Sequence, residues 1–412
     1  MKLFLVFLVF LFSVVCFSQQ DKKININTGR WAGNLNLNSV DVLPFRIKIL
    51  KKKSTFHFFI YNGKEKIEMD PISCVNDSLH VAFPYFNSKL VFSKNKKNYI
   101  SGYWVNFNKG ENYKIPFSAR HVKKSCFSIF QDRSTELSVD GKWKVEFAPK
   151  TDYSYPAIGL FSQKKNSNHL TGTFLTETGD YRFLEGHTKK ESLVLSCFDG
   201  SHAFLFKAVM VNKDSLSGRF LSGKHWETKW NAIKNQSFTL GSPEKLTYLV
   251  NGETISFNLK RLDGTLFSYP QDVSKNKVVI LQIMGSWCPN CLDETLFYKT
   301  LYDKYHNKGL EIISVAYEIG ETFDDYVTRV QKLKNKLSLD FTFLIGGKAN
   351  KSLASQHFKG LNQIVSFPTS IFIDKKGEVV RVHTGFNGPG TGIHYTNYKR
   401  KTTMLLEYLL AQ

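Results

Sequence analysis

The feature that most restricts the fold is a buried-strand pattern followed at once by two closely spaced cysteines. Val278 to Met284 is a continuous apolar run broken only by Gln282, which is typical of a strand buried on both faces of a sheet. The next segment, Gly285 to Cys291, has the sequence GSWCPNC, and Leu292 to His306 suits a helix. A strand that turns through such a segment into a helix predicts an α/β domain.

The spacing of Cys288 and Cys291 has a chemical reason. Two residues between cysteines at a helix start bring both sulfurs onto the first turn. There Cys288 lies near unpaired backbone N–H groups and the positive end of the helix dipole, which favour the attacking thiolate. Cys291, one turn deeper, can resolve a mixed disulfide. A structural disulfide or half of a zinc site are the alternatives, although a zinc site needs a second ligand pair that the sequence does not offer.

The α/β pattern continues on both sides of this motif. Asp263-Gly264 between two short apolar runs predicts a hairpin. The remaining expected strands are 310–317, 341–345, 369–373 and 379–382, and the remaining expected helices are 324–337 and 404–410. A polar stretch from Asn235 to Glu244, with Gly241 and Pro243, predicts a linker, which we place at 237–250 before the domain at 251–412.

Residues 245–412 resemble the TlpA/ResA branch of the thioredoxin superfamily. The motifs that carry the resemblance are the Asp263-Gly264 hairpin, Val278 to Cys291, the triplet FPT at 367–369, the turn KKG at 375–377 and the run GFNGPGTG at 385–392. The resemblance implies a thioredoxin-like fold, a thiol–disulfide oxidoreductase activity through Cys288 and Cys291, and no cofactor or metal. A peroxiredoxin is the rival within this fold, but Trp-Cys-Pro-Asn-Cys stands where that family carries a lone cysteine.

The resemblance also implies a role for Glu294, three residues after Cys291. In this branch an acidic residue here serves the cysteines, so Glu294 is expected to be a partly buried proton acceptor for Cys291 with a raised pKa. Classical thioredoxins carry their acidic residue six positions before the first cysteine, where this chain has Gln282. That departure favours Glu294. The alternative is a solvated helix carboxylate.

Three further residues are expected to bind the substrate or border the disulfide. The resemblance makes Pro368 the cis-proline that faces the cysteines and pairs with the substrate backbone, with Phe367 beside it. An ordinary trans turn is the alternative for Pro368. Trp287 is expected to pack beside the disulfide, a role that is compatible with simple core packing.

The region from about 28 to 235 is strand-like and shows signs of duplication. Short runs rich in aromatic and β-branched residues alternate with Asn, Gly, Asp and Lys clusters. Matching triplets recur in order at offsets that grow from 112 to 116 residues: GRW at 29 and GKW at 141, DSL at 77 and ESL at 191, ISG at 100 and LSG at 216. We therefore expect an all-β duplicated region with units at 19–127 and 128–236, followed by the α/β thioredoxin-like domain.

The N-terminus predicts export. Lys2 followed by the apolar run Leu3 to Val15 is typical of a cleaved signal peptide, which we place at 1–18 with cleavage after Ser18. A lipoprotein reading would lipidate Cys16, but Val15 is larger than such sites favour. A periplasmic or envelope location follows if the organism is a bacterium, and there a chain with free thiols needs a redox explanation.

The charge is strongly positive and unevenly distributed. The chain of 412 residues carries a formal net charge of +21, of which +15 falls between residues 19 and 240. Most of this excess lies in lysine pairs between strand-like runs, which are typical of solvated turns. An anionic membrane surface or polysaccharide is the alternative partner. Nucleic acid is not expected for an exported chain without a matching motif.

Cys74, Cys126 and Cys197 lie in the β-rich region and allow at most one disulfide among themselves. Cys197 lies in an apolar run and is expected to be a buried thiol. The sequence thus predicts an exported thiol–disulfide oxidoreductase, and the resemblance to the TlpA/ResA branch implies a reductase of protein disulfides that is recharged by a membrane-embedded electron donor. The alternative is an envelope ligand- or partner-binding protein in which the β-rich region carries the main function and the redox domain is accessory.

Overall fold

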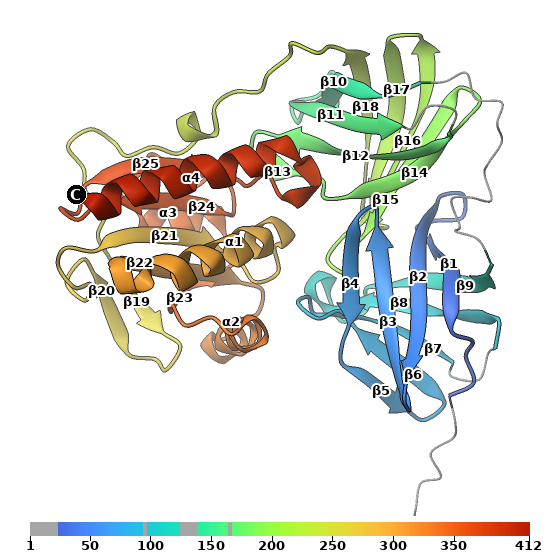
Figure 1. The fold of residues 1–412 in the computed structure, drawn as a ribbon, viewed down its shortest axis with the longest axis horizontal. Coiled ribbons are helices and arrows are strands. Elements are labelled where there is room, and N and C mark those ends of the chain that lie inside the picture. Colours follow the sequence, from blue (N-terminus) through green and yellow to red (C-terminus); the bar gives the residue numbers. More distant parts are fainter. Residues whose placement is uncertain (1–23, 94–96, 124–137, 164–166) are drawn as a thin grey trace, which may run out of the picture.

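The computed structural model describes residues 24–93, 97–123, 138–163 and 167–412, in which the chain forms three β-sheets (Figure 1). The expected signal peptide at 1–18 and Cys126 lie outside the described residues. Within these residues no helix is long and apolar enough to span a membrane.

The first β-unit is one antiparallel sheet whose described strands run in the spatial order β4-β3-β2-β1-β9-β8-β7-β6-β5. Its strands are β1 Gly29–Asn36, β2 Val42–Lys52, β3 Thr55–Asn62, β4 Glu65–Met69, β5 Ile72–Val75, β6 Ser78–Ala82, β7 Ser88–Ser93, β8 Tyr99–Asn106 and β9 Lys114–Val122, with a 3-10 turn at Phe107–Lys109. In β2 every second side chain from Leu43 to Ile49 is buried, because a strand presents alternate residues to its two faces.

The second β-unit repeats this arrangement. Its described strands follow the order β11-β10-β18-β17-β16-β15-β14-β12-β13, and an extra β11–β12 pairing closes them into a barrel-like sheet. They are β10 Gly141–Phe147, β11 Tyr155–Gln163, β12 His169–Thr176, β13 Gly179–Asp180, β14 Leu184–Lys189, β15 Ser192–Phe198, β16 Ala203–Asn212, β17 Ser215–Ser222 and β18 Trp226–Lys234.

Equivalent contacts in the two units confirm the duplication. The first strand of each unit pairs with the last, β1 with β9 and β10 with β18. The indole N–H of Trp31 donates to the backbone oxygen of Asn27, four residues earlier, and that of Trp143 donates to Val139 in the same way. The chain is therefore multidomain, with a duplicated all-β region before the α/β domain.

The C-terminal domain has a mixed sheet in the described order β20-β19-β23-β22-β21-β24-β25. Its strands are β19 Phe257–Arg261, β20 Leu266–Tyr269, β21 Val278–Met284, β22 Leu310–Glu318, β23 Thr342–Lys348, β24 Thr369–Ile373 and β25 Val379–Thr384. Its helices are α1 Pro289–Tyr305, α2 Phe323–Leu337, α3 Lys351–His357 and α4 Ile393–Ala411, with 3-10 turns at Pro243–Lys245, His306–Lys308 and Pro389–Thr391. Helix α4 begins eleven residues before the expected 404–410.

Strand β21 is central to this sheet and is buried along its whole length. It pairs in parallel with β22 and antiparallel with β24. Ile280 packs into a cluster with residues of α1, α2 and α4, whereas Leu281 packs on the opposite face with Ala354 of α3. Helices on both faces explain the continuous apolar run in the sequence.

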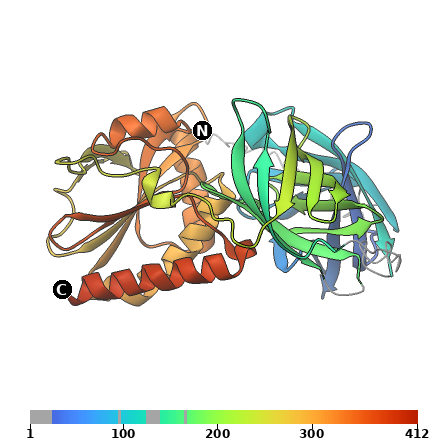
Figure 2. The same ribbon diagram turned by 90° about the horizontal axis from the view of Figure 1, so that it is seen from above.

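The C-terminal domain lies beside the two β-units, and both views show the start of α4 directed toward them (Figures 1 and 2). One cluster of buried apolar side chains extends from the first β-unit into this domain and includes Phe86 and Leu292. Ion pairs and hydrogen bonds also join the parts, among them Lys336–Asp70 and Arg329–Asn108. The β-rich region is therefore packed against the domain that carries the cysteine pair.

Candidate active site

The two cysteines lie where β21 passes into α1. Cys288 is the N-cap residue of α1, with extended backbone angles, and Pro289 occupies the first helical turn. The Cys288 sulfur accepts a hydrogen bond from the Cys291 backbone N–H at 3.3 Å. Proline suits this position because its missing N–H would have no partner in the helix. Both cysteines are free thiols, as are Cys74 and Cys197.

The two thiols differ in their surroundings. Cys288 keeps 9% of its surface exposed, whereas Cys291 is fully buried. Burial and the neighbouring Cys288 sulfur raise the pKa of the Cys291 thiol. Cys288 is therefore the more exposed of the two thiols, and Cys291 needs a group that takes its proton before it can attack.

Glu294 lies one helical turn after Cys291 and is fully buried, not partly buried as expected. Its carboxylate accepts hydrogen bonds from the Ser370 hydroxyl at 3.0 Å and from two tyrosine hydroxyls, of Tyr298 at 3.1 Å and Tyr398 at 3.3 Å. Burial raises the pKa of Glu294 to about 7, although these hydrogen bonds act in the opposite direction. A carboxyl group with this pKa can exchange a proton near neutral pH.

Gln282 completes the surroundings of Glu294. Its amide nitrogen donates to the Glu294 carboxylate at 2.9 Å, and its oxygen accepts from Ser314 at 2.8 Å. Gln282 stands where classical thioredoxins have an acidic residue, and here it binds Glu294, the acidic residue of this site. The strand position of Gln282 explains why one polar residue interrupts an otherwise apolar run.

The expected substrate-binding residues surround the outer cysteine. The Phe367–Pro368 peptide bond is cis, and the Cys288 thiol donates to the backbone oxygen of Phe367 at 3.7 Å. The indole of Trp287 donates to the backbone oxygen of Tyr317 at 2.9 Å and packs edge-on against Phe367. The structure thus brings together all six residues proposed from the sequence.

Sequence reasoning missed Glu318, at the end of β22. Its buried carboxylate accepts from the backbone N–H of Ser286 at 2.6 Å and from its hydroxyl at 2.8 Å, which fixes the turn before Trp287. Burial raises the pKa of Glu318 to about 7. The only signal in the sequence was a charged residue directly after an apolar strand.

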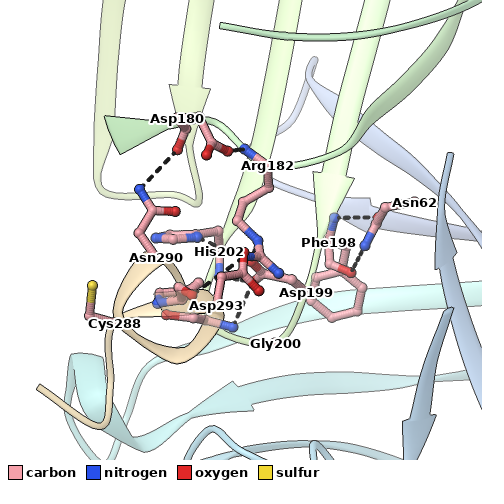
Figure 3. A network of polar contacts seen from close by, with 12 residues as sticks. Asn62, Asp180, Arg182, Phe198, Asp199, Gly200, His202, Cys288, Asn290 and Asp293 are labelled. Carbon is pink, nitrogen blue, oxygen red and sulfur yellow. Dashed lines mark hydrogen bonds and ion pairs between the residues drawn. The ribbon is translucent and has the colours of Figure 1, made fainter. Parts of the chain in front are cut away.

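Residues of the second β-unit also reach the active-site turn, and the sequence did not indicate them. The Asn290 side chain, between the cysteines, donates to the backbone oxygen of Asp180 at 3.4 Å. The Ser201 hydroxyl donates to the backbone oxygen of Trp287 at 3.2 Å. Figure 3 shows Asn290 and Asp293 of α1 directed toward Asp180 and Arg182. The site is therefore formed by two domains.

A cleft of about 420 Å³ lies between the second β-unit and the residues Asn290, Ser366 and Phe367. A larger cavity of about 900 Å³ lies between the first β-unit and α1, where Leu292 and Asp293 line it but neither active-site cysteine does. Neither cysteine lines the smaller cleft, but its lining includes Phe367, whose backbone oxygen accepts from the Cys288 thiol, and Asn290, which lies between the two cysteines in the sequence.

A thioredoxin-like sheet with this cysteine pair defines a thiol–disulfide exchange protein, and comparison with known proteins agrees. The Redoxin family matches residues 250–398. Thiol-disulfide oxidoreductase ResA of Geobacillus kaustophilus is 31% identical over 154 residues, which are 37% of this chain and 80% of that protein. ResA of Halalkalibacterium halodurans is 30% identical over 138 residues, 32% of this chain and 67% of that protein. The chain belongs to the ResA family of thiol-disulfide oxidoreductases.

The similarity covers only part of this chain and, for some relatives, only about half of the relative. ResA of Bacillus thuringiensis strain Al Hakam is 33% identical over 106 residues, which are 26% of this chain and 54% of that protein. Among solved structures, the thioredoxin domain of a thiol-disulfide oxidoreductase from Bacteroides vulgatus covers 37% of this chain and 98% of its own, with 19% identity and a TM-score of 0.28.

Proposed function

We propose that this chain is an exported reductase of protein disulfides that works through a Cys288/Cys291 dithiol. The observation that carries the proposal is the asymmetry of the pair at the start of α1. Cys288, beside the cis-proline loop, keeps 9% of its surface exposed, and Cys291 is fully buried near a carboxyl group whose pKa is about 7. This is the arrangement that two successive exchange steps need.

The proposed reaction has two steps. The Cys288 thiolate attacks one sulfur of the substrate disulfide, so a Cys288–substrate disulfide forms and the other substrate sulfur leaves as a thiolate that takes up a proton. Cys291 then gives its proton to Glu294 and attacks the Cys288 sulfur. This releases the second substrate thiol and leaves a Cys288–Cys291 disulfide. Two electrons pass to the substrate, and a dithiol reductant restores the enzyme.

The cellular setting is part of the proposal. The N-terminal pattern supports export to the periplasm or envelope, with a signal peptide at 1–18. A membrane-embedded electron donor follows from the resemblance to the TlpA/ResA branch. The +15 charge of residues 19–240 supports contact with an anionic envelope component. The comparisons do not favour the alternative in which the redox domain is accessory.

Turnover of a small disulfide tests the chemistry. The mature protein, supplied with dithiothreitol, should reduce hydroxyethyl disulfide, and Cys288→Ser should abolish this activity. Cys74→Ser is the matched control, because Cys74 is an exposed free thiol on β5 and should be dispensable. If Cys288→Ser retains wild-type turnover, Cys288 is not the nucleophile.

Trapping tests the substrate class. Cys291→Ser leaves Cys288 able to attack but removes the resolving thiol, so mixed disulfides with protein substrates should accumulate in cells. A non-reducing gel should show adducts that disappear in the Cys288→Ser/Cys291→Ser double variant. Their absence would count against protein substrates.

The reduction potential of the pair tests the direction of electron flow. A reductase should have a value near about −270 mV, as in thioredoxin, whereas an oxidant lies near about −120 mV. Equilibration against glutathione buffers measures it. A value at the oxidising end would overturn the assignment as a reductase.

A further inference from the structure

A hairpin of the second β-unit, residues 176–181, lies directly against the active-site turn. It joins β12 to the short strand β13 and contacts α1 through Asn290. A Cβ atom at Gly179 would lie 2.2 Å from the Asn290 amide nitrogen, so the contact requires a residue without a side chain there. Neither the reaction steps nor the thioredoxin-like sheet requires this hairpin.

The glycine run at 385–392 holds the hairpin in place. A Cβ atom at Gly385 would lie 2.4 Å from the Thr178 carbonyl carbon, and one at Gly390 would lie 2.8 Å from the Arg182 backbone oxygen. The backbone N–H of Gly388 donates to the Asp180 carboxylate at 2.5 Å. Because these residues have no side chains, the backbone of the glycine run and the backbone of the hairpin can lie in close contact.

Arg182, two residues after β13, fixes the end of the hairpin. Its buried guanidinium forms ion pairs with Asp293 of α1, with Glu65 of the first β-unit at 2.6 Å, and with Asp199 at 3.5 Å. Buried charges need such partners because the interior does not solvate them. The hairpin is therefore held by all three parts of the protein.

This fixed hairpin forms one wall of the 420 Å³ cleft, together with Tyr155 and Pro156, while Asn290, Ser366 and Phe367 form the other. The volume lies within the range of about 300–1,000 Å³ that is typical of ligand sites. The described residues that line the cleft include the carboxyl groups of Glu177 and Asp180 and no basic side chain. The Asp180 carboxylate accepts from two backbone N–H groups, of Gly388 and Arg182. Glu177 lines the cleft where the linker passes it, since a Cβ atom at Gly241 would lie 2.6 Å from the Glu177 carboxylate.

We propose that Glu177 on this hairpin is a specificity-determining residue, and that the cleft selects peptide segments whose reactive cysteine is flanked by lysine or arginine. The inference rests on the proposed function, because it concerns the substrate that Cys288 attacks. The carboxylate beside the cleft attracts a cationic segment and repels an anionic disulfide such as glutathione disulfide.

The test compares two symmetrical tripeptide disulfides with blocked termini, in which cysteine is flanked either by two lysines or by two glutamates. The full mature protein reduces each at low salt with dithiothreitol as the final reductant, and the rate without enzyme is subtracted. The measured quantity is the ratio of kcat/KM for the lysine peptide to that for the glutamate peptide. Each turnover converts one peptide disulfide to two thiols and oxidises one dithiothreitol.

Glu177→Gln should lower this ratio by about two- to five-fold, and Glu177→Lys should lower it further, with both effects lost near 1 M salt. Glu191→Gln removes the same charge from a turn of the same β-unit that does not line the cleft, so its ratio should equal that of the wild type. This control separates the local effect of the Glu177 carboxylate from the general effect of removing one negative charge from a protein whose net charge is +21.

Turnover of hydroxyethyl disulfide distinguishes a failure of the specificity proposal from a failure of the proposed reductase function. All four proteins should reduce this neutral substrate equally, because Glu177 takes no part in the exchange steps. The specificity proposal is wrong if all proteins reduce hydroxyethyl disulfide but the Glu177 variants change the peptide ratio no more than Glu191→Gln does. The proposed reductase function is unaffected by that result. If no protein reduces any disulfide, the proposed function itself fails.

Discussion

Arg182, in the second β-unit, forms a buried ion pair with Asp293, which lies two residues after the inner cysteine on α1 (Figure 3). The same guanidinium binds Glu65 of the first β-unit. Burial alone would lower the pKa of Arg182, but the surrounding carboxylates raise it well above its usual value, so the side chain stays cationic. One side chain thus ties the active-site helix to both copies of the duplicated β-unit.

Arg182→Met should therefore be strongly destabilising. It leaves three carboxyl groups buried without their cation, which costs about 3–5 kcal/mol of the free energy of unfolding. Urea unfolding at pH 7 measures the loss. Arg120→Met is the matched control, since Arg120 is exposed on β9, and it should change stability by about 0.5 kcal/mol or less. Equal effects of the two changes would show that the buried cluster does not hold the domains together.

Gly385→Ala tests the contact between the glycine run and the hairpin. Gly385 has a φ of +77°, so any side chain is strained, and a Cβ would also press on the Thr178 backbone. Gly377 has a φ of +87° but open space around its Cβ position, so Gly377→Ala reports the backbone strain alone. Gly385→Ala should cost about 1–3 kcal/mol more than Gly377→Ala in urea unfolding. Similar losses would mean that the hairpin moves aside without cost.

Glu294→Gln should change how the second exchange step depends on pH. With a Glu294 pKa of about 7, the carboxylate that accepts the Cys291 proton forms as the pH rises through that value. The rate at which Cys291 resolves a preformed Cys288 mixed disulfide should therefore rise around pH 7 in the wild type. This inflection should be absent in Glu294→Gln, which keeps the shape of the side chain but cannot titrate. Stopped-flow rates from pH 5 to 9 measure it, and an unchanged profile would remove Glu294 from the proton transfer.

Glu318→Gln should alter the pH dependence of stability. Its folded-state pKa of about 7 lies above the usual 4.5, so between these values the folded state binds a proton that the unfolded state has released. Glu318 thus stabilises the fold below pH 4.5, and this contribution of about 3 kcal/mol is lost as the pH rises to 7. The free energy of unfolding at pH 5, 6 and 7 should fall less steeply in Glu318→Gln than in the wild type. Parallel curves would show that Glu318 is already ionised in the folded protein.

The sequence alone determined the parts of the site that depend on local spacing. The strand before Cys288 and the helix after it follow from short-range periodicity and helix geometry. The resemblance added Pro368 and the role of Glu294, and the recurring triplets indicated the duplicated β-units. These features were accessible because each is encoded within about 20 residues or in a repeated pattern.

Only the tertiary structure decided which distant side chains complete the site. Asp180 and Arg182 lie more than 100 residues before Asn290 and Asp293, in a turn with no periodic signal. The burial that raises the pKa of Glu318 depends on how β22 and the turn before Cys288 pack together. Burial and ion pairing of this kind arise from the packing of separate chain segments. The cleft beside Phe367, with one wall from the second β-unit, therefore became visible only in the folded protein.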